Sequence, residues 1–205
     1  MAEAKKFGWG KWVAGAVAVA AGGAAYLYLK ERQAKAPRHE LLASEGAFEL
    51  RRYPAMLAIE TIQHGSRDRA LGNGFGLLAD YMFGGARADK DQDDEIPIAM
   101  PILAEPASGG SWRIRFLLPE GMTRKDVPEP GEGIAIVEIP ARDVAAVKVS
   151  GKPNDKLFAD KAAELLGWIS GRERVAAGDV EHAYYNSPLK PGTVKQNEIL
   201  VGLSL

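Results

Sequence analysis

Beyond residue 46, the apolar positions follow the same order of patterns twice, about 87 residues apart. In each half, an apolar residue recurs every three or four positions, which is typical of a helix with one buried face. The first stripe is Leu71, Phe75, Leu78 and Met82, and the second is Phe158, Ala162, Leu165 and Ile169. A glycine follows each stripe, at Gly84 and at Gly171. We therefore predict one helix in each half.

Strand patterns flank both predicted helices. Two strands that are separated by a Pro-Ala pair precede each helix, and two more follow it. The predicted strands are residues 48–52, 57–62, 96–103 and 112–118 in the first half, and 134–139, 144–149, 182–185 and 198–203 in the second. This predicts an α+β fold of duplicated β-β-α-β-β units. Because one unit cannot bury both its sheet face and its helix stripe, we expect the two copies to share one core.

The N-terminal region differs from the rest of the chain. Residues 12–29 are uncharged and lie between Lys11 and Lys30, with Trp and Tyr residues near both ends. That length and those flanks favour a transmembrane anchor. A cleaved signal peptide and a soluble helix hairpin are the alternatives. We predict a short N-terminal segment at 1–11, a single-pass membrane anchor at 12–29, a linker at 30–45 and the main domain at 46–205, preferably on the exported side of the membrane.

Charge and composition exclude several classes of function. Residues 1–38 carry a net positive charge, so the rest of the chain is clearly acidic although the net charge of the whole chain is only −1. We therefore expect no nucleic-acid partner. The chain has no cysteine, which excludes disulfides and thiolate metal sites. Residues 89–95 place acids at alternate positions but lack the glycine and the final glutamate of an EF-hand, so an exposed acidic loop is expected.

Several segments, in order along the chain, resemble the SOUL haem-binding protein family. They are Phe48–Pro54, Gly74-Phe75, Ile96–Ile102, Phe116–Pro119, Tyr185–Pro188 and Lys195–Ile199. The resemblance covers about residues 46–204. It implies a twisted antiparallel sheet of eight strands that curls toward a barrel, with two helices related by pseudo-twofold symmetry. It also implies reversible binding of haem or another tetrapyrrole, without a shared catalytic constellation.

The haem site itself is predicted around the first helix. Arg52 stands where some family members carry a proposed axial histidine, so another ligand is needed. His64 is the best candidate to ligate the iron, because it lies just before the first helix. Arg67 or Arg69 would pair with the propionates. Leu71, Phe75, Leu78 and Met82 would form the apolar wall against the ring.

Other interpretations of the same residues stay open. His64 can be an exposed loop histidine, and the apolar stripe can be ordinary core. The glycines at 72, 74 and 76 indicate a close approach of the helix either to a flat ligand or to the sheet. Binding of a different small hydrophobic ligand by an effector-binding domain is the main alternative function. A tetrapyrrole- or ester-directed enzyme and a membrane-proximal interaction module are further ones. The sequence shows no catalytic constellation, so we expect no enzyme activity.

Overall fold

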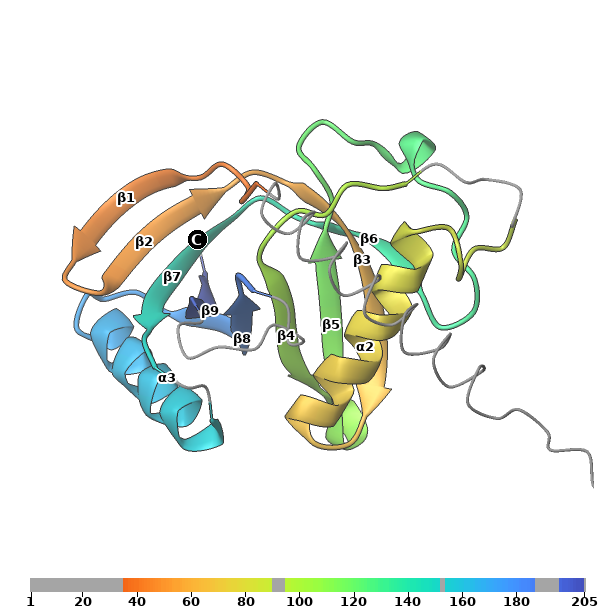
Figure 1. Ribbon diagram of the computed structural model, residues 1–205. Coiled ribbons are helices and arrows are strands. Elements are labelled where there is room, and N and C mark those ends of the chain that lie inside the picture. Colours follow the sequence, from red (N-terminus) through yellow and green to blue (C-terminus); the bar gives the residue numbers. More distant parts are fainter. Residues whose placement is uncertain (1–34, 90–94, 152–153, 187–195, 205) are drawn as a thin grey trace, which may run out of the picture.

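The computed structural model describes residues 35–89, 95–151, 154–186 and 196–204, and these form two helices packed on one antiparallel sheet (Figure 1). The strands are β1 (Glu40–Glu45), β2 (Phe48–Tyr53), β3 (Met56–His64), β4 (Ile102–Ala107), β5 (Ser111–Leu117), β6 (Ala135–Ile139), β7 (Arg142–Val149), β8 (Ala176–Tyr184) and β9 (Asn197–Leu203). The helices are α2 (Arg67–Met82) and α3 (Asp155–Ser170), with short 3-10 turns at Ser108–Gly110 and Arg124–Asp126. The described part of the chain is therefore α+β, as predicted, but its sheet has nine strands instead of eight and is open, with edges at β1 and β6, instead of curling into a barrel.

The sheet has nine strands in the order β1-β2-β7-β9-β8-β4-β5-β3-β6, and every neighbouring pair is antiparallel. The chain passes directly from β2 to β3 across Pro54-Ala55, and from β6 to β7 across Pro140-Ala141. Both proline breaks predicted from the duplication are thus present. Each leads the chain from one part of the sheet to another, because β2 pairs with β7 whereas β3 pairs with β5 and β6.

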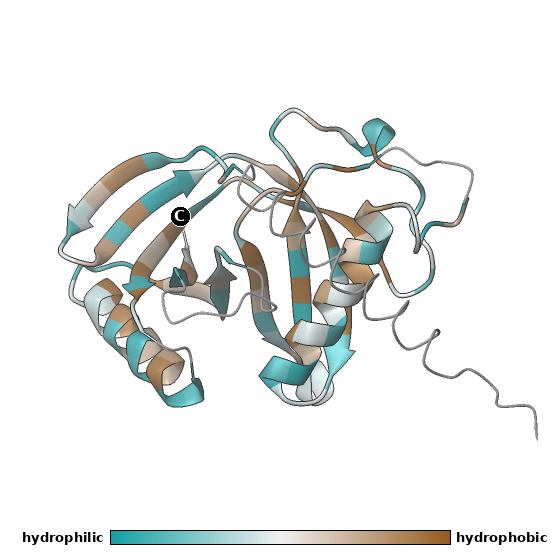
Figure 2. Cartoon of the chain, viewed as in Figure 1, coloured by the Kyte–Doolittle hydropathy of each residue, from teal (hydrophilic) through white to brown (hydrophobic). Residues whose placement is uncertain are grey.

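Both helices cover the same face of the sheet. α2 packs on β3 and β5, whereas α3 packs on β7, β8 and β9. Phe116 is paired with Ile102, and Ile102 with Tyr184, so these side chains share one face. Phe75 of α2 contacts Phe116, and Phe158 of α3 contacts Tyr184. Figure 2 shows the same arrangement, with brown apolar residues recurring along the helices and strands. The two halves share one core, as expected.

The opposite face of the sheet carries a second, smaller apolar layer. It contains several alanines among larger side chains, namely Tyr53, Ala58, Ala99, Leu103, Leu117, Ile139, Val144, Ala146, Ala183 and Leu200. Charged side chains lie on the same face on either side of this layer along the strands. Ala58 and Glu60 illustrate the order along β3, and Leu200 and Glu198 along β9, because alternate residues of a strand point to one face. This layer separates the two cavities described below.

The structure corrects three strand predictions. β1 lies in the segment predicted as a linker; it is mostly exposed and pairs only with β2 at the edge of the sheet, so no apolar alternation marks it. The strand predicted at 96–103 is β4, which begins only at Ile102. Pro97 and Pro101 lack the backbone N–H that a ladder requires. β8 begins at Ala176 rather than at residue 182, with a bulge between Ala177 and Val180.

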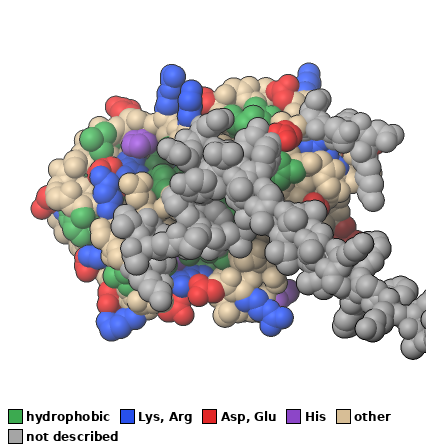
Figure 3. Space-filling model, viewed as in Figure 1, with side chains coloured by type: hydrophobic (Ala, Val, Ile, Leu, Met, Phe, Trp, Pro, Cys, Tyr) green, Lys and Arg blue, Asp and Glu red, His purple; other side chains and the backbone are tan. Residues whose placement is uncertain are grey.

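The predicted transmembrane segment, residues 12–29, lies outside the described residues. Among the residues that the structure does describe, no helix is long and apolar enough to cross a bilayer. On the face shown in Figure 3, basic and acidic side chains of the described residues lie interspersed, so that face carries charges of both signs.

Candidate functional site

The apolar stripe predicted to face a haem lies in the core. Leu71, Phe75, Leu78 and Met82 are all at most 5 % exposed. The ring of Phe75 lies 5.4 Å from the ring of Phe116, centroid to centroid. These four side chains therefore fill the space between α2 and the sheet. Their contact with a ligand remains a prediction, and a ligand at this position would have to displace core residues.

The close packing of α2 on the sheet explains why this helix carries a glycine, Gly74, at its centre. A Cβ atom at position 74 would lie 2.7 Å from Cγ1 of Ile114 on β5, which is closer than real side chains approach. Nothing lies within 4 Å of the corresponding positions at Gly72 and Gly76. The close approach that the glycine cluster indicated is therefore an approach to the sheet, and Gly74 is the residue that permits it.

The predicted polar partners of haem are spread around the start of α2. His64 is exposed at the end of β3, and Arg69 is exposed in the first turn of the helix. Arg67 is buried; it forms ion pairs of 2.8 Å with Asp68 and 2.9 Å with Asp155. His64 lines neither of the two cavities described below. Its role as an iron ligand stays a prediction.

His182 joins the two halves of the protein. Its ring stacks on Phe158 at 4.5 Å with an interplanar angle of 12°, and it lies 5.4 Å from the ring of Trp112. The hydroxyl of Tyr184 is 3.4 Å from Nδ1. Burial, reinforced by the positive charge of Arg67, lowers the pKa of His182 to about 4. His182 is therefore neutral at physiological pH and acts as part of the core.

The first cavity lies at the turn between β2 and β3 and encloses about 500 Å³; we call it the corner cavity. Four segments line it, residues 35–38, 54–57, 97–99 and 118–122. Most of the side chains are apolar, and the sulfur-containing residues Met56 and Met122 are among them. Lys35 and Arg38 add positive charge, and Nε of Arg38 lies 3.5 Å from Oε2 of Glu120. The cavity thus combines apolar walls with basic side chains.

A buried ion pair lies beside Tyr53, the residue that directly precedes Pro54 of the corner cavity. The guanidinium of Arg51 donates two hydrogen bonds of 2.7 Å to the carboxylate of Glu198, and a third of 3.2 Å to the hydroxyl of Tyr53. Tyr185 donates another, of 2.7 Å, to Glu198. Burial alone would lower the pKa of Arg51, but the carboxylate of Glu198 outweighs burial and raises it. Burial and the charge of Glu198 both raise the pKa of Tyr185, so its hydroxyl stays protonated.

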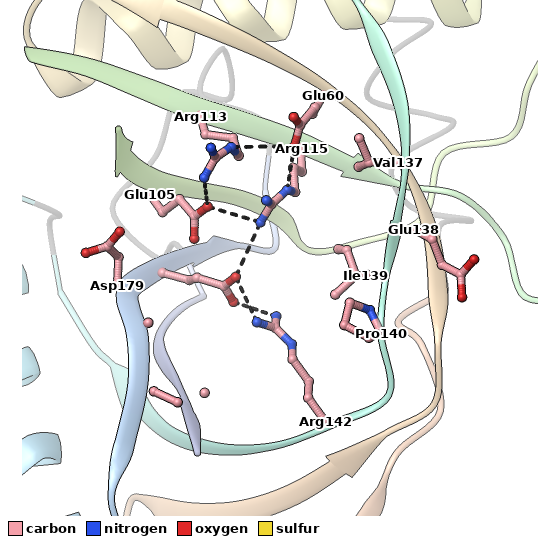
Figure 4. Close-up of a pocket in the computed structure, with 14 residues that line it drawn as sticks. Glu60, Glu105, Arg113, Arg115, Val137, Glu138, Ile139, Pro140, Arg142 and Asp179 are labelled. Carbon is pink, nitrogen blue, oxygen red and sulfur yellow. Dashed lines mark hydrogen bonds and ion pairs between the residues drawn. The ribbon is translucent and has the colours of Figure 1, made fainter. Parts of the chain in front are cut away.

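The second cavity, which we call the charged cavity, encloses about 410 Å³ on the face of the sheet opposite the helices, beyond the apolar layer (Figure 4). Charged side chains from five strands meet in it, namely Glu60, Glu105, Arg113, Arg115, Arg142 and Glu181. Figure 4 shows them as one connected network, with Val137, Ile139 and Pro140 on the opposite wall. Sequence reasoning did not find this site, because its charges come from strands far apart in the chain.

Comparison with known families now assigns this fold. A family model described as "SOUL heme-binding protein" matches residues 34–202. This chain belongs to the SOUL family. Three of the segments that carried the resemblance contribute residues to the corner cavity, namely Phe48–Pro54, Ile96–Ile102 and Phe116–Pro119. A comparison with curated proteins finds no match.

Solved structures show the same fold in proteins of different sequence. A hydrolase from Listeria innocua has a TM-score of 0.53 at 10 % identity, covering 80 % of this chain and 94 % of its own. The EcmrR C-terminal domain has a TM-score of 0.53 at 13 % identity, covering 77 % of this chain and 96 % of its own. EcmrR in a DNA complex has a TM-score of 0.58 at 10 % identity, covering 77 % of this chain and 57 % of its own. At these identities the likeness extends to the fold alone.

Proposed function

We propose that this SOUL protein binds a tetrapyrrole, haem in the first place, in the corner cavity. The observation that carries the proposal is the cavity's lining in a member of this family: apolar walls for a flat ring, and Lys35 and Arg38 for its carboxylates. A volume of about 500 Å³ falls within the roughly 300–1,000 Å³ of typical ligand pockets. Burial of the ring would supply most of the affinity. The protein would then buffer or carry haem rather than transform it.

Iron ligation would be weak or absent in this cavity. The thioethers of Met56 and Met122 are the lining groups of a type that ligates haem iron. His64 lies eight residues beyond Met56 on β3, which corresponds to about 26 Å at 3.3 Å per residue. It could not ligate a haem held at the other end of the strand. The corner cavity and the predicted site around His64 are therefore alternatives that one titration can separate.

We also propose that residues 12–29 anchor the domain in a membrane, preferably on the exported side. The backbone oxygen of Lys35 accepts a hydrogen bond of 3.2 Å from the N–H of Met100, which ties the start of the domain to the corner cavity. Lys35 lies six positions after Leu29, and an extended chain of that length spans at most about 22 Å. An anchor would thus hold the cavity close to the lipid headgroups, where a tetrapyrrole could be exchanged. Flotation of the full chain with lipid vesicles tests the anchor separately.

A haem titration of the full chain in detergent, followed in the Soret region, tests the binding proposal. Ala55 lines the cavity and is exposed, so Ala55→Trp should fill the opening and weaken binding at least tenfold. Ala141 is the matching exposed residue after the second proline, and Ala141→Trp is the control that should bind normally. His64→Ala should also bind normally.

Three results would contradict the proposal or part of it. Normal binding in Ala55→Trp together with loss in His64→Ala would move the site to the start of α2. Failure to bind haem at all would refute tetrapyrrole binding. A porphyrin without iron should bind about as well as haem; a large preference for haem would refute weak ligation. Saturable binding of a different hydrophobic ligand, blocked by Ala55→Trp and without haem binding, would establish the alternative function of a general effector-binding domain.

A further inference from the structure

We propose that the charged cavity is a second binding site, specific for a small organic carboxylate with an apolar body. The site is independent of the tetrapyrrole proposal, because the apolar layer lies between the two cavities. Along β3, Met56 lines the corner cavity, Ala58 belongs to the layer and Glu60 lines the charged cavity. The corner cavity therefore lies at the start of β3, where residues of both apolar layers line it, and the charged cavity lies further along the strand on the face opposite the helices.

The network in the cavity alternates basic and acidic side chains. Arg113 binds Glu105 at 2.5 Å, and Arg115 lies 3.2 Å from Glu105 and 3.6 Å from Glu181. Nη1 and Nη2 of Arg142 donate hydrogen bonds of 3.0 and 2.6 Å to the two oxygens of Glu181, and this pair is the last in the series of ion pairs. Glu60 lies between Arg113 and Arg115, at 3.6 and 2.9 Å. Each of the three carboxylates thus contacts two arginines.

The arginines keep donors that these carboxylates do not use. Nε of Arg142 is buried and has no hydrogen-bond acceptor, and Nε of Arg113, also buried, lies 3.6 Å from Oε2 of Glu60, beyond hydrogen-bond distance. A guanidinium offers five N–H groups, whereas an ionised carboxylate only accepts. Leaving a buried donor unpaired is unfavourable. A carboxylate oxygen of a ligand would supply the acceptor that the protein alone does not offer to this donor. This asymmetry favours an anionic ligand over a cationic one.

The walls of the cavity determine what the uncharged part of the ligand should be. Val137, Ile139 and Pro140 lie together opposite the arginines, and they offer an apolar surface to a ring or a short chain (Figure 4). Glu138 lies between Val137 and Ile139 on β6, so its side chain points to the other face, and Figure 4 shows its carboxylate turned away from the network. Asp179 is exposed at the rim, where its negative charge acts on Arg113. The interior therefore presents three arginines, three glutamates and an apolar wall.

Three ligands with the same ring and different charge test the proposal on the full chain in detergent: benzoate, benzamide and benzamidine. Isothermal calorimetry should show saturable binding of benzoate, with benzamide and benzamidine at least tenfold weaker. Equal or tighter binding of benzamidine would overturn the proposal, as would absence of saturable benzoate binding. Ala55→Trp should leave benzoate binding unchanged; a parallel loss would place benzoate in the corner cavity and refute the second site.

Two variants locate the carboxylate in the cavity. Arg142→Lys keeps the positive charge but removes the forked guanidinium, and it should weaken benzoate binding at least tenfold. Arg52→Lys is the matched control, because Arg52 forms a similar fork with Asp143 outside the cavity, at 2.7 and 3.0 Å. Val137→Glu should abolish binding by placing a resident carboxylate on the apolar wall, which keeps the test valid if Arg142→Lys unfolds. Unchanged benzoate affinity in a folded Arg142→Lys or Val137→Glu protein would refute the site.

Discussion

His182 lies buried between the rings of Phe158 and Trp112, and its replacement by Phe should make the protein more resistant to mild acid. Phe keeps a flat ring in the stack but cannot be protonated. The variant gives up only the weak contact between Nδ1 and the hydroxyl of Tyr184, at 3.4 Å. The difference between the two proteins therefore isolates the titration of one side chain.

The size of the effect follows from the pKa of His182. Burial and the charge of Arg67 lower it from 6.5 to about 4 in the folded protein. Between these values the unfolded chain binds a proton that the folded protein does not, so stability falls as the pH falls from about 6.5 to about 4, and the loss is complete below the folded pKa. A difference of about 2.5 units at 1.36 kcal/mol per unit corresponds to about 3 kcal/mol. Above pH 6.5 the histidine is neutral in both states and contributes no pH dependence.

Urea unfolding followed by tryptophan fluorescence at pH 7, 6, 5 and 4 measures this effect in the full chain. Wild type should lose about 3 kcal/mol more than His182→Phe between pH 7 and pH 4. Asp143, whose pKa is lowered by its hydrogen bond to Arg52, destabilises both proteins as the pH falls through still lower values, and its effect cancels in the comparison. Equal losses in the two proteins, or an NMR titration of His182 near 6.5, would refute the reasoning.

Four further substitutions test other parts of the fold, each by the same unfolding measurement at pH 7. Glu198→Gln removes one of the two carboxylates that pair with the buried guanidinium of Arg51, the other being Glu49, and should cost about 1.5–3 kcal/mol; a loss below 1 kcal/mol would show that the pair is not buried as described. Gly74→Ala should destabilise α2 by about 1–3 kcal/mol through its clash with β5, whereas Gly76→Ala should stabilise it by up to about 1 kcal/mol; the same sign for both would contradict the packing. Asn154→Ala removes the side-chain hydrogen bond that caps α3 and should cost about 0.5–2 kcal/mol, and no change would mean that the cap does not form in solution.

Much of the architecture was predictable because it depends on local patterns. The stripe from Leu71 to Met82 repeats with the period of a helix, and all four of its residues are buried in α2. The breaks at Pro54 and Pro140 are local as well, since proline cannot donate to a strand ladder. β1 escaped prediction because an edge strand is held mainly by backbone pairing with β2, which leaves its side chains free of the apolar alternation that marks a half-buried strand.

The sites depend on contacts between distant parts of the chain. Arg51 and Glu198 are 147 positions apart, and Arg142 and Glu181 are 39 apart, so no spacing in the sequence announces either pair. The corner cavity is likewise assembled from four separate segments. Sequence reasoning therefore placed the candidate site on the most conspicuous apolar stripe, where the structure has packed core.

By itself, the sequence determined the duplication, the two helices, most of the strands and the membership in the SOUL family, because periodicity and motif order are properties of neighbouring residues. Only the tertiary structure decided that α2 packs its stripe against β5, that Gly74 serves that contact, and that the charged cavity lies on the opposite face of the sheet while residues of both faces line the corner cavity. The physical reason is that an apolar side chain has the same pattern whether a sheet or a ligand covers it. Which of the two covers it depends on the register and order of strands that are far apart in the chain.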